Sequence, residues 1–150
     1  MNTEQYSHPD SLERYAFLWS EARLVIAATA LFLGGVPVLR VLVPVPALSW
    51  VVSILLTIMW IISGAAAAYL LYRWYGNKYM IFGGTDMYDK AAFLVSSVSG
   101  INLGIVGVIG TNIGMSISSN RTVFLAVALI YVMSAAYLLQ RWTTSGKKVF

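Results

Sequence analysis

Four apolar segments, each of about 20 residues or more, occupy most of this chain, and their length is the strongest constraint on its fold. A helix of this length crosses the hydrocarbon core of a bilayer. Hydrophobic residues make up 59% of the chain and charged residues only 11%, which lies far outside the composition of soluble domains. In lipid, each segment must satisfy its own backbone polar groups, and a helix does so. We therefore predict an all-α membrane protein with four transmembrane helices, forming a single transmembrane domain over residues 1–150.

One short phrase occurs twice in the chain. AAYLLYRW at residues 67–74 returns as AAYLLQRW at residues 135–142, and seven of the eight positions are identical. Upstream of each copy, DSLERYAFL at residues 10–18 is echoed by DMYDKAAFL at residues 86–94. We interpret these two echoes as a tandem duplication of a two-helix hairpin.

The duplication also predicts how the two halves are related. Repeat one covers about residues 10–75 and repeat two about residues 86–142. Because each repeat contains two spans, both copies enter the membrane from the same face, which gives two tandem, parallel-repeated helical hairpins. A pseudo-two-fold axis along the membrane normal relates repeats of this kind.

Glycine and proline residues set the expected ends of the spans. The first span has two possible positions, residues 24–43 or residues 16–35, and we favour the second because it follows the repeat. It leaves a proline-rich elbow over residues 37–46, where proline breaks the helix. The other spans are expected over residues 47–72, 91–117 and 122–139. The tail over residues 143–150 is polar, and we expect it to be mobile.

The basic residues are divided unequally between the two sides of the predicted bundle. With four spans, both termini and the central connector share one side, and only Arg40 and Arg121 lie on the other. Because positive charge stays in the cytoplasm, we predict a multi-pass protein of the plasma (inner) membrane with cytoplasmic N- and C-termini. Four residues near the ends of the second and fourth spans are expected to act as cytoplasmic anchors: Arg73, Trp74, Arg141 and Trp142.

The third predicted span carries a stripe of small residues. Its members recur every three or four positions and are Ser96, Gly100, Gly104, Gly107, Thr111 and Gly114. Small residues at this spacing allow another helix to approach closely, which matters because lipid provides no hydrophobic drive for helix association. The stripe can pack inside the same bundle, form a subunit interface in an oligomer or line a pore, and the sequence leaves these alternatives open.

A buried amide is expected in the same span. Asn102 falls near its middle, where its side chain needs a hydrogen-bonding partner on another helix. Ser53, Thr57 and Ser63 on the second span are the expected partners. A structural role is the simpler interpretation, and a role in permeation or ligand binding is the alternative.

Glu21 and Arg23 are the only charged residues expected within the first span. Both lie near its cytoplasmic end, from which long side chains can reach the interface, so we expect interfacial anchoring. Glu21 can then pair with Arg73 or Arg141. A functional role is the alternative, because charges inside a membrane are costly and usually mark a functional site.

The chain offers little for catalysis. The acidic pairs Asp10–Glu13 and Asp86–Asp89 fit helix starts, where an N-cap acceptor and a carboxylate suit the positive end of the helix dipole. The chain contains no cysteine, and His8 is its single histidine, so no metal site or cofactor is expected. Its scattered basic residues do not form the patch that nucleic acid requires.

These observations favour a non-enzymatic protein. We expect an integral membrane scaffold or accessory subunit that self-assembles, or docks on membrane partners, through the Gly/Ser-rich third helix. Its partners would be the lipid bilayer and either further copies of the chain or other membrane subunits. The alternative is a small oligomeric channel or transporter that uses Asn102, Ser99, Glu21 and Arg23.

Overall fold

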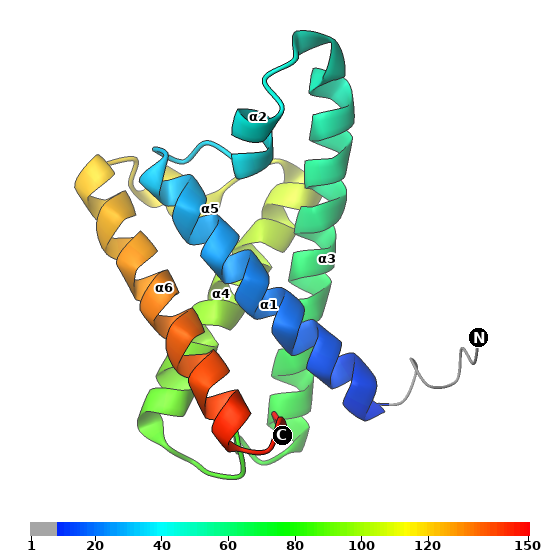
Figure 1. The fold of residues 1–150 in the computed structure, drawn as a ribbon, viewed down its shortest axis with the longest axis vertical. Helices are drawn as coiled ribbons and strands as arrows, with labels where there is room; N and C mark the ends of the chain where they lie inside the picture. The colour runs from blue at the N-terminus through cyan, green and yellow to red at the C-terminus, as the bar shows by residue number, and fades with distance from the viewer. Residues whose placement is uncertain (1–8) are drawn as a thin grey trace.

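A computed structural model describes residues 9–150, and within this range it contains helices and no β-strand (Figure 1). The four long helices are α1 (Pro9–Phe32), α3 (Ser49–Gly76), α4 (Met87–Ile109) and α6 (Arg121–Thr144). Three short helices lie in the connections: α2 (Val38–Leu42), the 3-10 helix η2 (Pro46–Leu48) and α5 (Ile113–Ile117). All four long helices are long and apolar enough to cross a membrane, which confirms the predicted number of candidate spans.

Glycine residues end the first helix of each half. After Phe32, Gly34 and Gly35 adopt positive φ angles of 80° and 87°, so the first helix ends close to the favoured position. The prediction that the third span reaches Ile117 is wrong, because α4 ends at Ile109. Gly110 adopts a left-handed φ of 80° there, which is a common helix termination that an apolar run does not reveal.

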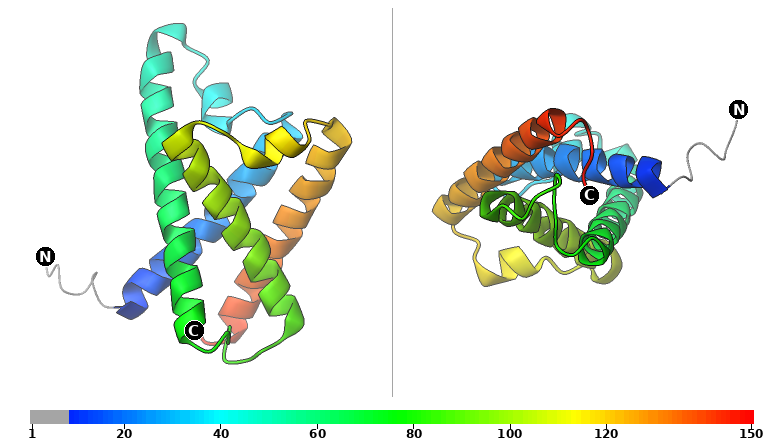
Figure 2. Two further views of the ribbon diagram at one scale, coloured as in Figure 1. Left: turned by 180° about the vertical axis from the view of Figure 1, so that it is seen from behind. Right: turned by 90° about the horizontal axis from the view of Figure 1, so that it is seen from below.

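The long helices cross one another obliquely (Figure 2). We call the end of the bundle that holds the aromatic core the convergent end and the opposite end the divergent end. α1 packs most extensively on α6, and α3 packs most extensively on α4. Both termini of the described chain and the connector between α3 and α4 lie at the convergent end (Figure 1). The short helices α2 and α5 lie at the divergent end, so each half contains a helix, an interrupted elbow and a second helix.

Two aromatic pairs fill the convergent end. The Phe17 ring packs against Trp142 with ring centroids 5.8 Å apart, and the Phe93 ring packs against Trp74 at 5.3 Å. Phe17 and Phe93 occupy the same position in the two sequence echoes, and so do Trp142 and Trp74. Trp142 is 7% exposed and belongs to the core, so its indole is not available as an anchor in lipid.

Each half also contains one salt bridge at this end. Arg73 pairs with Glu13 at 2.7 Å, and Arg141 pairs with Asp89 at 2.7 Å. The two carboxylates, like the two arginines, occupy equivalent positions in the echoes. The expected pairing of Glu21 with Arg73 or Arg141 is therefore wrong. The expected helix start is found at α4, where the Asp86 carboxylate accepts hydrogen bonds from two backbone amides of the first turn.

The C-terminal tail packs onto the core, so the expectation of a mobile segment over residues 143–150 is wrong. Val149 is 2% exposed, and its carbonyl accepts a hydrogen bond of 2.7 Å from the Phe82 amide. The Phe150 amide donates to a Glu13 carboxylate oxygen at 3.1 Å. The polar composition of residues 143–150 did not predict this packing, because Val149 is the one buried side chain among them.

The tail and the connector share a backbone conformation. Lys78 and Tyr79 in the connector have φ angles of 55° and 61°, and Gly146 and Lys147 in the tail have 71° and 65°. These positions are separated by the same 68 residues that separate the two AAYLL phrases. The similarity of the two halves thus extends beyond the residues that the echoes cover.

Candidate functional site

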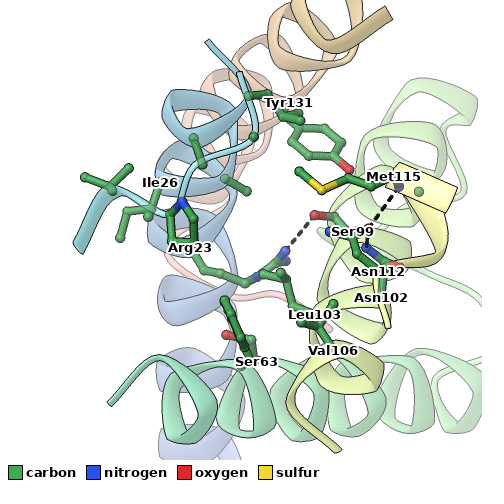
Figure 3. A pocket seen from close by; sticks show the side chains of 18 of the residues that line it. Arg23, Ile26, Ser63, Ser99, Asn102, Leu103, Val106, Asn112, Met115 and Tyr131 are labelled. Carbon is green, nitrogen blue, oxygen red and sulfur yellow. Dashed lines mark hydrogen bonds between the residues drawn. The ribbon is translucent and has the colours of Figure 1, made fainter. Parts of the chain in front are cut away.

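A cavity of about 390 Å³ lies between the four long helices, in the divergent half of the bundle (Figure 3). Most of its lining is apolar, and α2 and α5 contribute residues at the divergent end. Its hydrogen-bonding side chains come from all four long helices and the second elbow, and they are Trp19, Arg23, Ser63, Ser99, Asn102, Asn112, Ser118 and Tyr131. The cavity volume lies within the range of about 300–1,000 Å³ that small-molecule sites occupy.

Arg23 reaches this cavity from α1. One terminal nitrogen, Nη1, donates to the Ser99 hydroxyl at 2.9 Å, and the other, Nη2, donates to the Ser96 carbonyl at 2.8 Å. The residue is only 5% exposed, and its Nε–H has no hydrogen-bonding partner. Within residues 9–150, no carboxylate lies within 4.0 Å of the guanidinium.

Glu21 also contacts Ser96. The Ser96 hydroxyl donates to Glu21 Oε1 at 3.0 Å and also accepts a longer hydrogen bond from Arg23 Nη2 at 3.4 Å. Glu21 is 2% exposed, and its second carboxylate oxygen has no partner. Ser96 therefore links two opposite charges that do not touch each other.

The prediction that Glu21 and Arg23 anchor α1 at the interface is wrong. α1 begins at Pro9, so both residues lie near its middle, where their side chains face α4 and cannot reach the helix end. The sequence contains a signal for this arrangement that the prediction did not use. DSLERYAFL and DMYDKAAFL are 76 residues apart, and under this offset Glu21 and Arg23 align with Ser97 and Ser99. The alignment places polar residues on the facing helix.

The small-residue stripe packs on α3 of the same chain. A Cβ atom added at Gly104 would lie 2.7 Å from the Gly64 Cα, and one added at Gly100 would lie 2.6 Å from the Ala67 Cβ. At Gly107 the nearest atom, on Ile61, would lie 2.9 Å away. The glycines thus allow α3 and α4 to approach more closely than any residue with a Cβ atom would permit.

The stripe does not continue as one helical face beyond Gly107. Because α4 ends at Ile109, Thr111 lies in the linker and Gly114 lies in α5. The expectation that all six residues share one face is wrong for these two.

Asn102 has different partners from those expected. Its amide nitrogen donates to the Asn112 side-chain oxygen at 3.0 Å, and its oxygen accepts from the Ile113 backbone amide at 3.1 Å. Asn102 therefore fixes the second elbow against α4 at the edge of the cavity. Ser63 instead accepts a hydrogen bond of 3.1 Å from the Trp19 indole, and Ser53 and Thr57 donate to backbone carbonyls of their own helix.

The described residues contain no group of three acidic or histidine side chains that can hold a metal ion. His8, which we expect not to bind metal, lies outside the described residues. The cavity holds hydrogen-bond donors and hydroxyl groups around one buried cation. This arrangement can bind an acceptor group.

Comparison of the chain with known protein families, curated proteins and solved structures gives no match. The fold and the site therefore define its class on their own: a helical protein with four candidate membrane spans and a polar group enclosed between them.

Proposed function

We propose that this protein is a small membrane transporter that binds an amphiphilic molecule with an anionic head group in the cavity between its helices. The observation that carries the proposal is Arg23, a buried cation in an apolar cavity with one N–H group unpaired. Burying a guanidinium is costly unless its hydrogen bonds and its charge are both satisfied. A ligand carboxylate or similar anion beside the guanidinium would balance its charge more directly than Glu21, which reaches it only through Ser96.

The rest of the cavity indicates the other end of the ligand. Apart from its few polar groups, the lining consists of aliphatic side chains such as Leu103 and Val106, which Figure 3 shows facing the same space as Arg23. An apolar body would pack against these side chains, while the head group would lie at Arg23. Charged residues inside a membrane are rare and typically mark the path or the binding site of a substrate.

Binding of decanoate, compared with decanol, tests this function by calorimetry in nanodiscs. We expect the double variant E21L/R23M to weaken decanoate binding by roughly ten- to a hundredfold, as loss of a charged hydrogen bond implies, and to leave decanol binding unchanged. The double variant avoids leaving one unpaired buried charge. R14M, which removes an exposed arginine, is the matched control. Equal decanoate affinity in E21L/R23M and the native protein would refute the proposal.

The scaffold hypothesis receives less support from this geometry. Docking through Gly100 and Gly104 would require α3 to leave a face that it already contacts closely, and Ser96 already contacts Glu21 and Arg23 on α1. A partner can bind elsewhere on the surface, but no feature of the described residues favours a particular patch.

For the architecture, we propose two tandem hairpins related by a pseudo-two-fold axis along the membrane normal. The reciprocal aromatic pairs, the matching salt bridges and the matching connector conformations support it. Under this proposal, Arg23 and Ser99 occupy equivalent positions and meet across the axis. Two arginines there would repel each other, which gives a physical reason why only one repeat keeps the charge.

We also propose that the convergent end faces the cytoplasm, on the basis of its excess of basic residues. Because the chain contains no cysteine, single cysteines report the orientation directly. We expect S49C, at the divergent end, to react with an impermeant maleimide added outside intact cells. T85C in the connector should react only after the cells are permeabilised. The reverse pattern would show that the protein inserts in the opposite orientation.

A further inference from the structure

A shallow apolar groove lies between α4 and α6 on the outside of the bundle. Its volume is about 450 Å³, and its lining includes Leu94, Val98 and Ile130, which are 40%, 65% and 49% exposed. Two further lining residues, Ser99 and Tyr131, also line the central cavity. These two side chains therefore form the boundary between the groove and the cavity.

The groove leads directly to the buried cation. It begins near Ala91, about one turn into α4, and reaches Ser99 near the middle of that helix. The Ser99 hydroxyl accepts a hydrogen bond of 2.9 Å from Arg23. Figure 3 shows Tyr131 projecting from α6 towards the same space. A head group that moved along the groove from the interface would thus meet Arg23 immediately beyond the boundary.

The equivalent position in the first half of the chain carries a large side chain. Trp19 on α1 donates its indole N–H to Ser63 on α3, and this large side chain joins the two helices of that half. Under the offsets of the two sequence echoes, Trp19 aligns with Val95 and Ser63 aligns with Tyr131. The second half therefore has a small aliphatic residue on α4 where the first has a tryptophan on α1, and a tyrosine on α6 where the first has a serine on α3.

From these observations we infer that a single-chain anionic amphiphile enters the cavity sideways from the lipid, between α4 and α6, past Ser99 and Tyr131. The inference rests on the proposed function and adds the route and the physical source of the ligand. The apolar, exposed groove residues accommodate a hydrocarbon chain, and Arg23 provides the complementary charge at the inner end. The groove starts at the convergent end and the cavity lies in the divergent half, so the route leads from one leaflet towards the other.

The test places in the groove the tryptophan that the first half carries at the equivalent position. V95W changes a residue that lines the groove and not the cavity, and L129W, at a site 56% exposed on α6, is the matched control. A diazirine derivative of decanoate is added to vesicles, and photolabelling of the cavity residues Leu103 and Val106 is followed over time by mass spectrometry. We expect V95W to slow this labelling at least about tenfold and L129W to leave it unchanged.

Two further measurements separate the possible failures. A91W fills the groove near its outer end and should slow labelling as V95W does. Decanoate affinity at equilibrium, measured by calorimetry, should be equal in V95W and the native protein. Unchanged labelling rates in both V95W and A91W, with normal affinity, would overturn lateral entry alone. No decanoate binding by the native protein would instead overturn the proposed function, and lateral entry with it.

Discussion

Replacing Glu21 with leucine is expected to lower the free energy of unfolding by about 3–5 kcal/mol, the cost of leaving one member of a buried charged pair uncompensated. Glu21 is 2% exposed, and its carboxylate accepts the hydrogen bond of Ser96, which in turn contacts Arg23. Without Glu21, the buried guanidinium loses the negative charge that it contacts through Ser96. The measurement is unfolding in detergent micelles with increasing dodecyl sulfate, followed by circular dichroism.

The double variant E21L/R23M separates the effect of the buried charges on stability from the effect of packing. Apolar residues of similar volume often replace a buried ion pair without loss of stability, so we expect this variant to recover most of the native value. D10L provides the matched control, because Asp10 is exposed in the first turn of α1, and it should change stability little. A double variant less stable than E21L would mean that Arg23 makes its own favourable contribution, and the two residues would then not act as a compensating pair.

Replacing Gly104 with leucine is expected to be nearly as damaging, with a loss of about 3 kcal/mol, at the upper end of typical overpacking costs. Even the first added carbon would lie 2.7 Å from the Gly64 Cα, and a backbone atom cannot move aside as a flexible side chain does. α3 and α4 must therefore separate, or α4 must rotate. The midpoint of thermal unfolding in micelles reports the loss.

Gly76 offers a matched control for this substitution. It is the last residue of α3, and a Cβ atom added there has no neighbour within 4 Å, so G76L should preserve stability. The particle mass in nanodiscs, measured for both variants, decides between the two roles of the stripe. Packing within one chain predicts lower stability of G104L at unchanged mass. A smaller particle with native stability would instead identify Gly104 as part of a subunit interface.

The two halves of the chain are alike at one end of the bundle and differ at the cavity. The two halves have matching aromatic pairs and salt bridges at the convergent end, where their role is to hold the helices together. They differ at the aligned pairs Trp19/Val95 and Arg23/Ser99. Trp19, Arg23 and Ser99 line the cavity, and Val95 lines the groove. Under the duplication that we propose, these two differences between the halves lie where a ligand would bind and enter.

Most of the secondary structure could be predicted from the sequence, because each helix depends on its own residues. Apolar length predicts four helices, and the glycines after Phe32 predict the end of the first. The end of α4 at Ile109 could not be recognised in the same way. Gly110 stops the helix there, while Gly100, Gly104 and Gly107 lie within it, and composition alone does not distinguish a helix-ending glycine from a packing glycine.

The sequence by itself determined the all-helical class, the four candidate spans and the repeated phrases, since length, composition and spacing are local properties. Only the tertiary structure decided that Glu21 and Arg23 face Ser96 and Ser99, that the glycine stripe packs on α3, and that a cavity remains between the helices. The physical reason is that a helix apolar on all sides has no preferred face for its neighbours. Its rotation and its partner are set by close packing and by the few polar groups that must find each other, and both depend on the whole bundle.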